Sequence, residues 1–251
     1  MNIAGHRLVR AARYAELKAR EGGYFDLAFV QAMPEAARLR CLSLLGASQS
    51  QLRQDLFALS MHGFKSGGFF VEFGATDGVE LNNTVLMERG FGWTGLLAEP
   101  ARGWQADLKA NRTATIDTRC VWRASGETLR FTETPRGENS ALSHVVSARR
   151  RARGTSYDVT TISLNDLLEE HSAPQRIDYM SVDTEGTEAD ILGALDWSRW
   201  SFGVITVEHN FAPQRAELIT ILTGAGYVQV LPEVSRFDDW YVDPIIAARL
   251  G

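Results

Sequence analysis

The run from Phe69 to Gly78 constrains the fold more than any other part of the chain. Four of its first five residues are apolar and predict a short buried strand, a glycine-bounded turn follows, and residues 80–89 predict a helix. Bare glycines let ligand atoms approach the backbone, and the free N–H groups at the start of a helix face such a ligand. This run therefore predicts a binding site for an anion or a nucleotide at the edge of a sheet.

The glycine spacing narrows the class of ligand. Gly74 and Gly78 form Gly-x-x-x-Gly with Glu72 two residues ahead, which differs from the Gly-x-Gly-x-x-Gly of dinucleotide-binding proteins. A carboxylate beside the turn suits a ligand that carries a sulfonium and an ammonium better than one that carries a pyrophosphate. The spacing therefore favours S-adenosyl-L-methionine over NAD.

Charge and cysteine content exclude several other classes of protein. The net charge of -5 argues against general nucleic-acid binding, which usually shows as a basic patch or a high pI. Cys41 and Cys120 are the only cysteines, so the chain has neither a disulfide framework nor a cysteine zinc site.

Hydrophobic patterning predicts a cytoplasmic enzyme with no integral membrane segment. The longest apolar runs have the length of strands. The first twenty residues lack the apolar core of a signal peptide because six basic residues interrupt them. These residues are His6, Arg7, Arg10, Arg13, Lys18 and Arg20.

Residues 1–62 predict an N-terminal helical extension. Leu8, Ala11, Ala12, Ala15 and Ala19 recur near helical spacing. Further helices are expected over 35–45 and 50–61. The first helix is either an arm that docks on a partner or an anionic surface, or an amphipathic helix packed on its own domain. A homodimer contact through these helices is also possible.

From residue 63 to residue 251 the pattern predicts a single α/β domain. Strands alternate with helices, which indicates a doubly wound, mostly parallel sheet whose last strand is antiparallel. Strands are expected at 69–73, 94–98, 115–122, 177–182, 203–208, 227–231 and 240–246. Helices are expected near 80–89, 101–110, 163–171, 187–196 and 213–223.

The segment 133–158 fits neither periodicity and predicts a long loop. Loops of this length in compact domains are usually functional or disordered. The segment holds the basic run Arg149-Arg150-Arg151 together with Arg153. It is either a lid over the active site, where the arginines meet an anionic substrate, or a mobile, solvated flap.

Two further places at the carboxyl ends of the predicted strands suit a nucleoside. Glu99 follows the second strand about twenty residues after the glycine turn, where an acidic side chain accepts hydrogen bonds from ribose hydroxyls. Val121 and Trp122 end the third strand and suit the wall of an adenine site, although core packing explains them nearly as well. Glu72 has an alternative role as a cap for nearby backbone N–H groups.

Carboxylates gather after the fourth and fifth strands. Asp183, Glu185 and Glu188 follow the strand at 177–182, and Glu208 and His209 follow the next one. Clustered carboxylates repel one another, so such a cluster persists where it meets a cation, a donor group or a metal.

These motifs resemble FkbM-family S-adenosylmethionine-dependent methyltransferases. The resemblance covers residues 49–245 and rests on SQLRQDLF, VEFGATDGVELNNT, GWTGLLAEP, IDYMSVDTEGTEADIL and VITVEHN. It implies a Class I (Rossmann-like) fold with a seven-stranded sheet, and methyl transfer to a hydroxyl of a sugar, polysaccharide or natural-product acceptor. The cofactor residues of the family correspond to Glu72, Gly74, Asp77, Gly78 and Glu99 here, and Asn83-Thr84 matches its element near the methionine end.

An alcohol is a weak nucleophile, so a general base or a metal must activate it. His209 is the obvious base at neutral pH, and Asp183, Glu185 and Glu208 are carboxylate candidates. Asp183, Glu208 and His209 also occupy positions similar to the metal ligands of catechol-type O-methyltransferases. Their hard oxygen ligands favour Mg²⁺, Mn²⁺ or Ca²⁺.

Two other functions compete with methyl transfer to a small-molecule or glycan acceptor. An NAD-dependent sugar-modifying oxidoreductase or epimerase shares the strand, turn and helix, but its glycine spacing differs. A non-catalytic partner protein would keep the cofactor fold, but it would have no need of the carboxylates at 183, 185 and 208.

Overall fold

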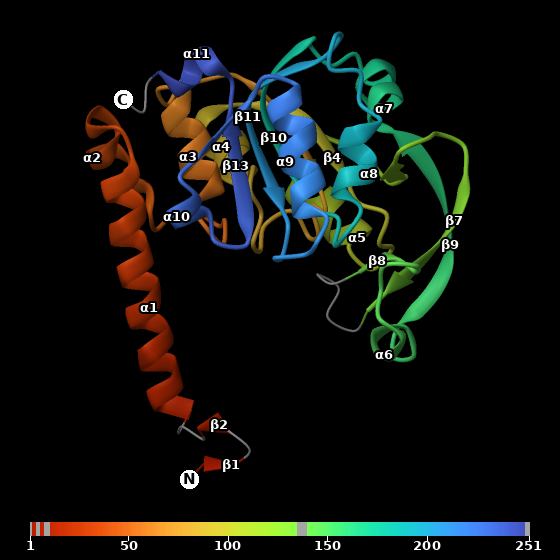
Figure 1. Ribbon diagram of the computed structural model, residues 1–251, viewed down its shortest axis with the longest axis horizontal. Helices are drawn as coiled ribbons and strands as arrows, with labels where there is room; N and C mark the ends of the chain where they lie inside the picture. The colour runs from red at the N-terminus through yellow and green to blue at the C-terminus, as the bar shows by residue number, and fades with distance from the viewer. Residues whose placement is uncertain (1, 4–5, 8–10, 135–139, 249–251) are drawn as a thin grey trace.

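The computed structural model describes residues 2–3, 6–7, 11–134 and 140–248. A large twisted sheet with helices on both faces forms the body of the molecule, and a smaller sheet lies beside it (Figure 1). Within the described residues the large sheet has seven strands. Their order is β12 (Val228–Val230), β13 (Asp238–Val242), β11 (Ser201–Glu208), β10 (Arg176–Val182), β3 (Phe69–Phe73), β4 (Thr94–Ala98) and β5 (Thr115–Asp117).

This sheet confirms the expected Class I architecture. All its neighbouring pairs are parallel except those made by β13, which runs antiparallel to both β11 and β12. The chain proceeds from β3 toward β5 in one direction and from β10 toward β11 in the other. The strand order therefore reverses between β3 and β10, the place where open α/β sheets bind ligands.

Alternating side chains of the strands divide the core between the two faces. In β3, Phe70 packs in one apolar cluster, while Val71 and Phe73 pack in the other. The first cluster includes side chains of α1 (Ala11–Ala32), α2 (Glu35–Leu44), α3 (Gln54–Met61), α4 (Val85–Phe91), α5 (Gln105–Asn111), α10 (Pro232–Ser235) and α11 (Pro244–Ala247). The second includes side chains of α7 (Leu164–Glu170), α8 (Glu188–Gly193) and α9 (Arg215–Gly224).

The strand expected at 115–122 is divided between two sheets. Asp117 ends β5 and its Oδ1 accepts the N–H of Arg119 at 2.8 Å, which closes a tight turn. The chain then enters β6 (Cys120–Trp122), which pairs with β9 (Thr155–Ser163) of the smaller sheet. A local side-chain hydrogen bond, invisible in the apolar pattern, makes this break.

The expectation of a long loop at 133–158 is wrong. This segment contains the end of β7 (Thr128–Glu133), β8 (Ala141–Leu142), α6 (Ala148–Arg151) and the start of β9. Six residue pairs between β7 and β9 hold the segment in the smaller sheet. A role as a lid stays a prediction.

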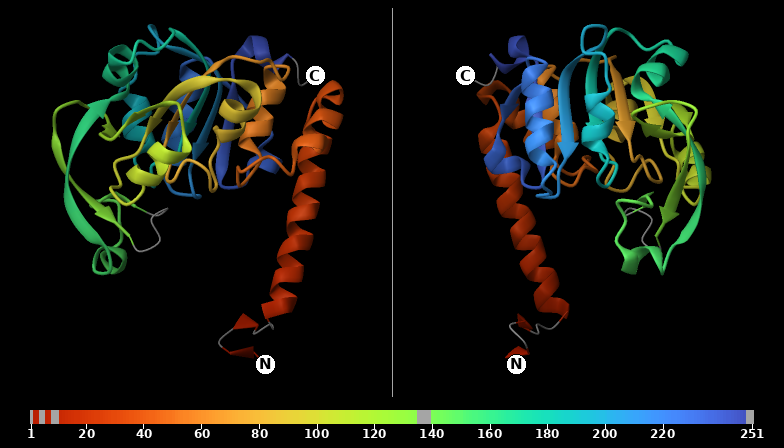
Figure 2. Two further views of the ribbon diagram at one scale, coloured as in Figure 1. Left: turned by 180° about the vertical axis from the view of Figure 1, so that it is seen from behind. Right: turned by 45° about the vertical axis from the view of Figure 1, so that its right-hand side comes forward.

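The N-terminal region differs in part from its helical prediction. Two short strands, β1 (Asn2–Ile3) and β2 (His6–Arg7), pair antiparallel before α1, and Leu8 lies outside the described residues. Figure 2 shows that the first half of α1 projects from the body of the molecule. The second half packs through Phe25 and Phe29 in the core, and every residue of α3 is buried, its apolar residues in the same core.

Two element boundaries differ from their predictions for local reasons. The helix expected from residue 80 starts at Val85, because Asn82 Oδ1 accepts the N–H groups of Thr84 and Val85 at 3.0 and 2.8 Å. The last strand ends at Val242 rather than at 246, because Asp243 caps a helical turn by accepting the N–H of Ile245.

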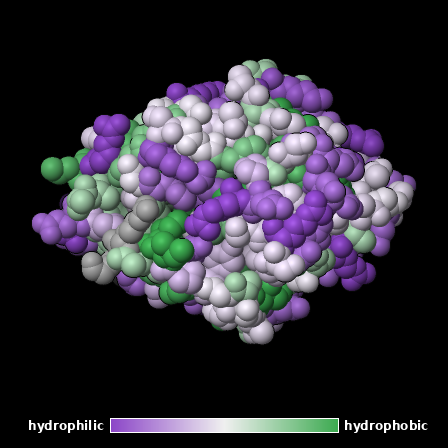
Figure 3. Space-filling model, turned by 90° about the horizontal axis from the view of Figure 1, so that it is seen from above, coloured by the Kyte–Doolittle hydropathy of each residue, from purple (hydrophilic) through white to green (hydrophobic). Residues whose placement is uncertain are grey.

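The outer surface seen from above is mostly hydrophilic, with small apolar groups between the polar side chains (Figure 3). Among the helices of the described residues, none combines the length and apolar character that a membrane span requires.

Candidate active site

A pocket opens at the carboxyl ends of β3, β4, β10 and β11, where the strand order reverses. Residues of β6, β8 and β13 and the start of α3 complete its lining. The structure brings eight of the predicted site residues into this lining. They are Gly74, Asp77, Asn83, Glu99, Val121, Asp183, Glu185 and Glu208.

Gly74 allows the end of β3 to approach the end of β10. Its φ of 76° lies in the left-handed region, and a Cβ placed on it would lie 2.1 Å from the backbone oxygen of Asp183. Since no side chain tolerates that distance, only glycine fits. Asp77 then shapes the turn, because its Oδ1 accepts the N–H groups of Val79 and Glu80 at 2.8 and 2.9 Å.

Glu99 is a buried carboxylate at the end of β4. It accepts the N–H of Thr76 at 2.9 Å and the N–H of Ala101 at 2.8 Å, so it joins the glycine turn to the next loop. Burial raises the pKa of Glu99 to about 7, and the nearby charge of Glu133 adds to the shift. A carboxyl that titrates near neutrality inside a cleft is a candidate for ligand binding.

Glu72 lies behind the pocket and supports its floor. Its carboxylate accepts hydrogen bonds from Asn82 Nδ2 at 2.9 Å, the N–H of Asn83 at 2.8 Å and Thr84 Oγ1 at 2.5 Å. Neither Glu72 nor Thr84 belongs to the described lining. The geometry therefore supports the capping role of Glu72 rather than direct contact with a ligand.

A buried arginine completes the same support. Arg112 donates to Glu88 at 2.8 Å, to Asn82 Oδ1 at 2.9 Å and to Thr84 Oγ1 at 2.9 Å. Gly78 gives room for it, because a Cβ there would lie 2.6 Å from Arg112 Cγ. Gly78 thus shapes the turn from behind the pocket.

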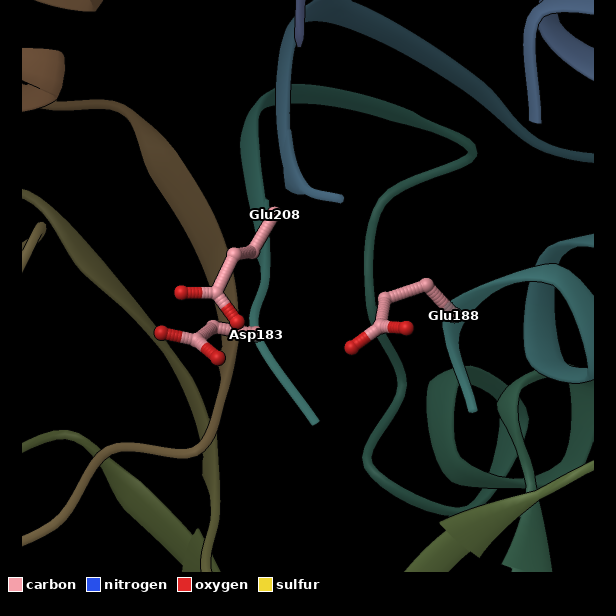
Figure 4. Close-up of side chains that lie close together, drawn as sticks. All are labelled: Asp183, Glu188 and Glu208. Carbon is pink, nitrogen blue, oxygen red and sulfur yellow. The ribbon is translucent and has the colours of Figure 1, made fainter. Parts of the chain in front are cut away.

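Three carboxylates converge at the carboxyl ends of β10 and β11, two of them in the pocket lining and the third beside it (Figure 4). Asp183, Glu188 and Glu208 each contribute one oxygen, and these oxygens lie within 4.8 Å of one another. Asp183 and Glu208 are the two members of this group that also line the pocket. Burial and mutual repulsion raise the pKa of Asp183 well above its ordinary value and that of Glu208 to about 8.

His209 does not join these carboxylates, which corrects its prediction as a base and metal ligand. Its Nδ1 accepts the N–H of Phe211 at 2.9 Å, and its Nε2 lies 3.6 Å from Asp239 Oδ1. Burial lowers the pKa of His209. Successive residues of a strand face opposite sides, so Glu208 reaches the pocket while His209 packs behind it, and Glu188 takes its place in the cluster.

The apolar wall of the pocket includes Val121 but not Trp122. The side chain of Trp122 packs in the core of the smaller sheet, with its ring 5.7 Å from that of His144. Phe131 and Trp104 line the pocket instead, and the indole N–H of Trp104 is buried without a hydrogen-bond partner among the described residues.

A comparison with family models decides the class of this protein. The model described as Methyltransferase FkbM domain matches residues 72–228, more than half of the chain. The chain belongs to the FkbM methyltransferase family. The match includes the glycine turn, Glu99 and the carboxylates of β10 and β11, and it favours a methyltransferase over an NAD-dependent oxidoreductase.

Comparisons with individual proteins add less. A search of curated proteins found no match. A solved structure, the precorrin-6y C5,15-methyltransferase from Geobacter metallireducens GS-15, is similar at 10% identity and a TM-score of 0.41, over 75% of this chain and 85% of that one. A likeness this distant says nothing about the acceptor.

The pocket of this FkbM methyltransferase also holds residues that sequence analysis missed. Gln54 lines the pocket from α3, and its Nε2 donates to Asp238 Oδ2 at 2.8 Å. Gln51 lies in the same SQLRQDLF motif that carries the family resemblance, which was an available signal. The sequence around Asp238 carries no comparable signal, because only the antiparallel pairing of β13 brings this residue opposite Glu208.

The buried carboxyls predict that the unbound enzyme loses stability as the pH rises. Burial raises the pKa of Glu99 and of Asp238 to about 7, whereas both groups titrate near 4 in an unfolded chain. Between about pH 5 and pH 8 the native state therefore holds more protons, and the free energy of unfolding falls. We expect a higher melting temperature at pH 6 than at pH 8, and a flatter dependence in Asp238→Asn. A melting temperature that rises across this range would contradict the burial of these groups.

Proposed function

We propose that this FkbM methyltransferase uses S-adenosyl-L-methionine and methylates a hydroxyl oxygen of a small-molecule or glycan acceptor. The observation that carries the proposal is the closely spaced carboxyl pair Asp183–Glu208 in the same pocket as the glycine turn and Glu99. The family membership supports methyl transfer as the reaction. The carboxyl pair supplies a base that can activate an alcohol as the methyl acceptor.

The pocket residues fit the parts of this cofactor. Glu99 offers a carboxylate to the ribose hydroxyls, and Val121 and Phe131 offer an apolar wall to the adenine. Asn83 Oδ1 is buried and accepts no hydrogen bond from the described residues, while its Nδ2 donates to Ser181 Oγ at 3.0 Å. This unused acceptor suits the ammonium of the methionine end.

When bound, S-adenosyl-L-methionine supplies an electrophilic methyl group on its sulfonium. The task of the protein is to hold the acceptor oxygen in line, about 3 Å from the reacting carbon, and to remove its proton. Asp183 and Glu208 suit this second task, because a carboxyl whose pKa is raised accepts a proton from a hydroxyl more readily than an ordinary one. Glu188 is fixed by the N–H groups of Thr184 and Gly186, both at 3.0 Å, and keeps the loop after β10 in place.

A comparison of melting temperatures tests the cofactor. Saturating S-adenosylmethionine should raise the melting temperature by several degrees, because a ligand that binds only the native state stabilises it, and NAD should leave it unchanged. A shift with NAD alone would overturn the proposal. A shift with S-adenosylmethionine but no turnover on a broad panel of hydroxyl acceptors would instead favour a non-catalytic partner protein.

A divalent cation is a second candidate for activating the hydroxyl. The convergence of Asp183, Glu188 and Glu208 favours it, since three carboxylate oxygens suit Mg²⁺, Mn²⁺ or Ca²⁺. If a metal is required, EDTA should abolish turnover and Mg²⁺ or Mn²⁺ should restore it. If the carboxyl pair alone acts as base, activity in EDTA should equal that of the untreated enzyme. In either case turnover is measured as the release of S-adenosylhomocysteine.

A further inference from the structure

The polar lining of the pocket carries one sign of charge. Seven of the described lining residues are acidic, and none is a lysine, arginine or histidine. The acidic residues are Asp77, Glu80, Glu99, Asp183, Glu185, Glu208 and Asp238. Raised pKa values leave Glu99, Asp183, Glu208 and Asp238 with only part of their full charge at neutral pH. The lining remains negative because no cationic side chain in it offsets the charge that is left.

The arginines of the described residues all lie outside this lining. Arg112 lies behind the floor, where it pairs with Glu88 at 2.8 Å. Arg215 pairs with Asp239 at 2.8 Å, beside His209 and outside the lining. Arg151 of the basic run donates to the backbone oxygen of Ser143 at 2.6 Å, and α6 contributes no residue to the described lining.

The proposed cofactor neutralises only part of the negative charge of the lining. Its sulfonium and ammonium carry two positive charges and its carboxylate one negative charge, so it adds one net positive charge. A cleft lined by one sign of charge focuses the field and concentrates ions of the opposite sign. An acceptor with a phosphate or a carboxylate must therefore enter against this field.

We infer that the acceptor of this enzyme is a hydroxyl compound that is neutral or bears a protonated amine, and that the pocket rejects phosphorylated and carboxylated acceptors. This inference rests on the proposed function and narrows its substrate class. It also opposes the expectation that the arginines of 149–153 meet an anionic substrate, because the carboxylates lie where the acceptor must react.

The reaction rates of charged thiol reagents test whether the pocket prefers cations to anions, and this test does not require the acceptor to be known. Gln51 is exposed and lines the pocket. Of the native cysteines, which are both buried, Cys41 lies outside the described lining and Cys120 belongs to it, so the rate of each reagent with the wild-type protein is subtracted. In Gln51→Cys we expect a trimethylammonium-ethyl methanethiosulfonate to react faster than its sulfonato-ethyl analogue. Relative to the same ratio in Gln31→Cys, on the exposed face of α1, the preference should be about tenfold. Addition of Glu80→Gln to the Gln51→Cys variant should reduce it. Equal ratios at positions 51 and 31 would overturn the inference.

Turnover of matched sugars provides the second readout. Methyl glucoside, methyl glucosaminide and methyl glucuronide differ in charge on one scaffold, and release of S-adenosylhomocysteine is measured for each. Turnover of the glucuronide in preference to the other two would overturn the inference. Calorimetry with S-adenosylmethionine separates the two proposals: loss of binding with a preserved reagent ratio contradicts only the cofactor, whereas binding with equal ratios contradicts only the charge selection.

Discussion

The Asp183→Asn variant should bind S-adenosylmethionine as tightly as the wild-type enzyme and lose turnover by a factor of about 10²–10⁴. Asparagine has nearly the same shape as aspartate, but it accepts no proton from a hydroxyl. The variant also removes a carboxyl whose pKa burial raises well above its ordinary value, so the free energy of unfolding should not fall. Calorimetry for the cofactor and single-turnover methyl transfer measure the two effects separately.

Asp190→Asn is the matched control for this experiment. Asp190 is an exposed aspartate of α8, 3.7 Å from Arg123, and a surface pair of this kind contributes little to stability. Its variant should retain wild-type turnover. If Asp183→Asn also retained turnover, the Asp183–Glu208 pair would have no catalytic role and the convergence of carboxylates in Figure 4 would have to serve another purpose.

Gly74→Ala should abolish cofactor binding and lower the free energy of unfolding by about 2–5 kcal/mol. A positive φ costs an alanine roughly 1–2 kcal/mol, and overpacking adds roughly 1–3 kcal/mol. The added Cβ meets a backbone oxygen at 2.1 Å, which no rotamer change relieves, so β3 and β10 must separate. The melting temperature should fall by about 4–20 °C for a domain of this size.

Gly126→Ala separates the clash from the backbone strain. Gly126 has nearly the same φ, 78°, but no neighbouring atom lies within 4 Å of its added Cβ. In this variant the free energy of unfolding should fall only by the cost of the positive φ, and the cofactor should bind as it does in the wild type. Equal losses in the two variants would show that contact with the Asp183 backbone is not what requires a glycine at position 74.

The large sheet was predictable because its signals are strong and local. β3 and β4 have the predicted bounds, since short apolar runs between turn residues leave few alternatives. Two of the errors arose where a single side chain redirects the backbone. Asp117 closes the turn that ends β5, and Asn82 delays the start of α4. Neither hydrogen bond leaves a periodic trace in the sequence.

Site residues at the ends of parallel strands were predictable from the sequence, whereas those that depend on side-chain direction or on strand pairing were not. Glu99, Asp183 and Glu208 end three strands, so strand order alone brings them to one pocket. His209 was wrongly included because adjacent positions on a strand face opposite sides, and the sequence does not show which side is the pocket. Asp238 was missed because its place depends on the antiparallel pairing of β13.

The most direct test of the central claim, that this pocket binds S-adenosylmethionine for methyl transfer, is calorimetric titration of the wild-type enzyme and of Glu99→Ala. Glu127→Ala, at an exposed glutamate, serves as the control. We expect the wild type and the control to bind alike, and Glu99→Ala to bind at least tenfold more weakly, because a hydrogen-bonded charge contributes about 1.5–3 kcal/mol. Unchanged affinity in Glu99→Ala, or no binding by the wild-type enzyme, would contradict the claim.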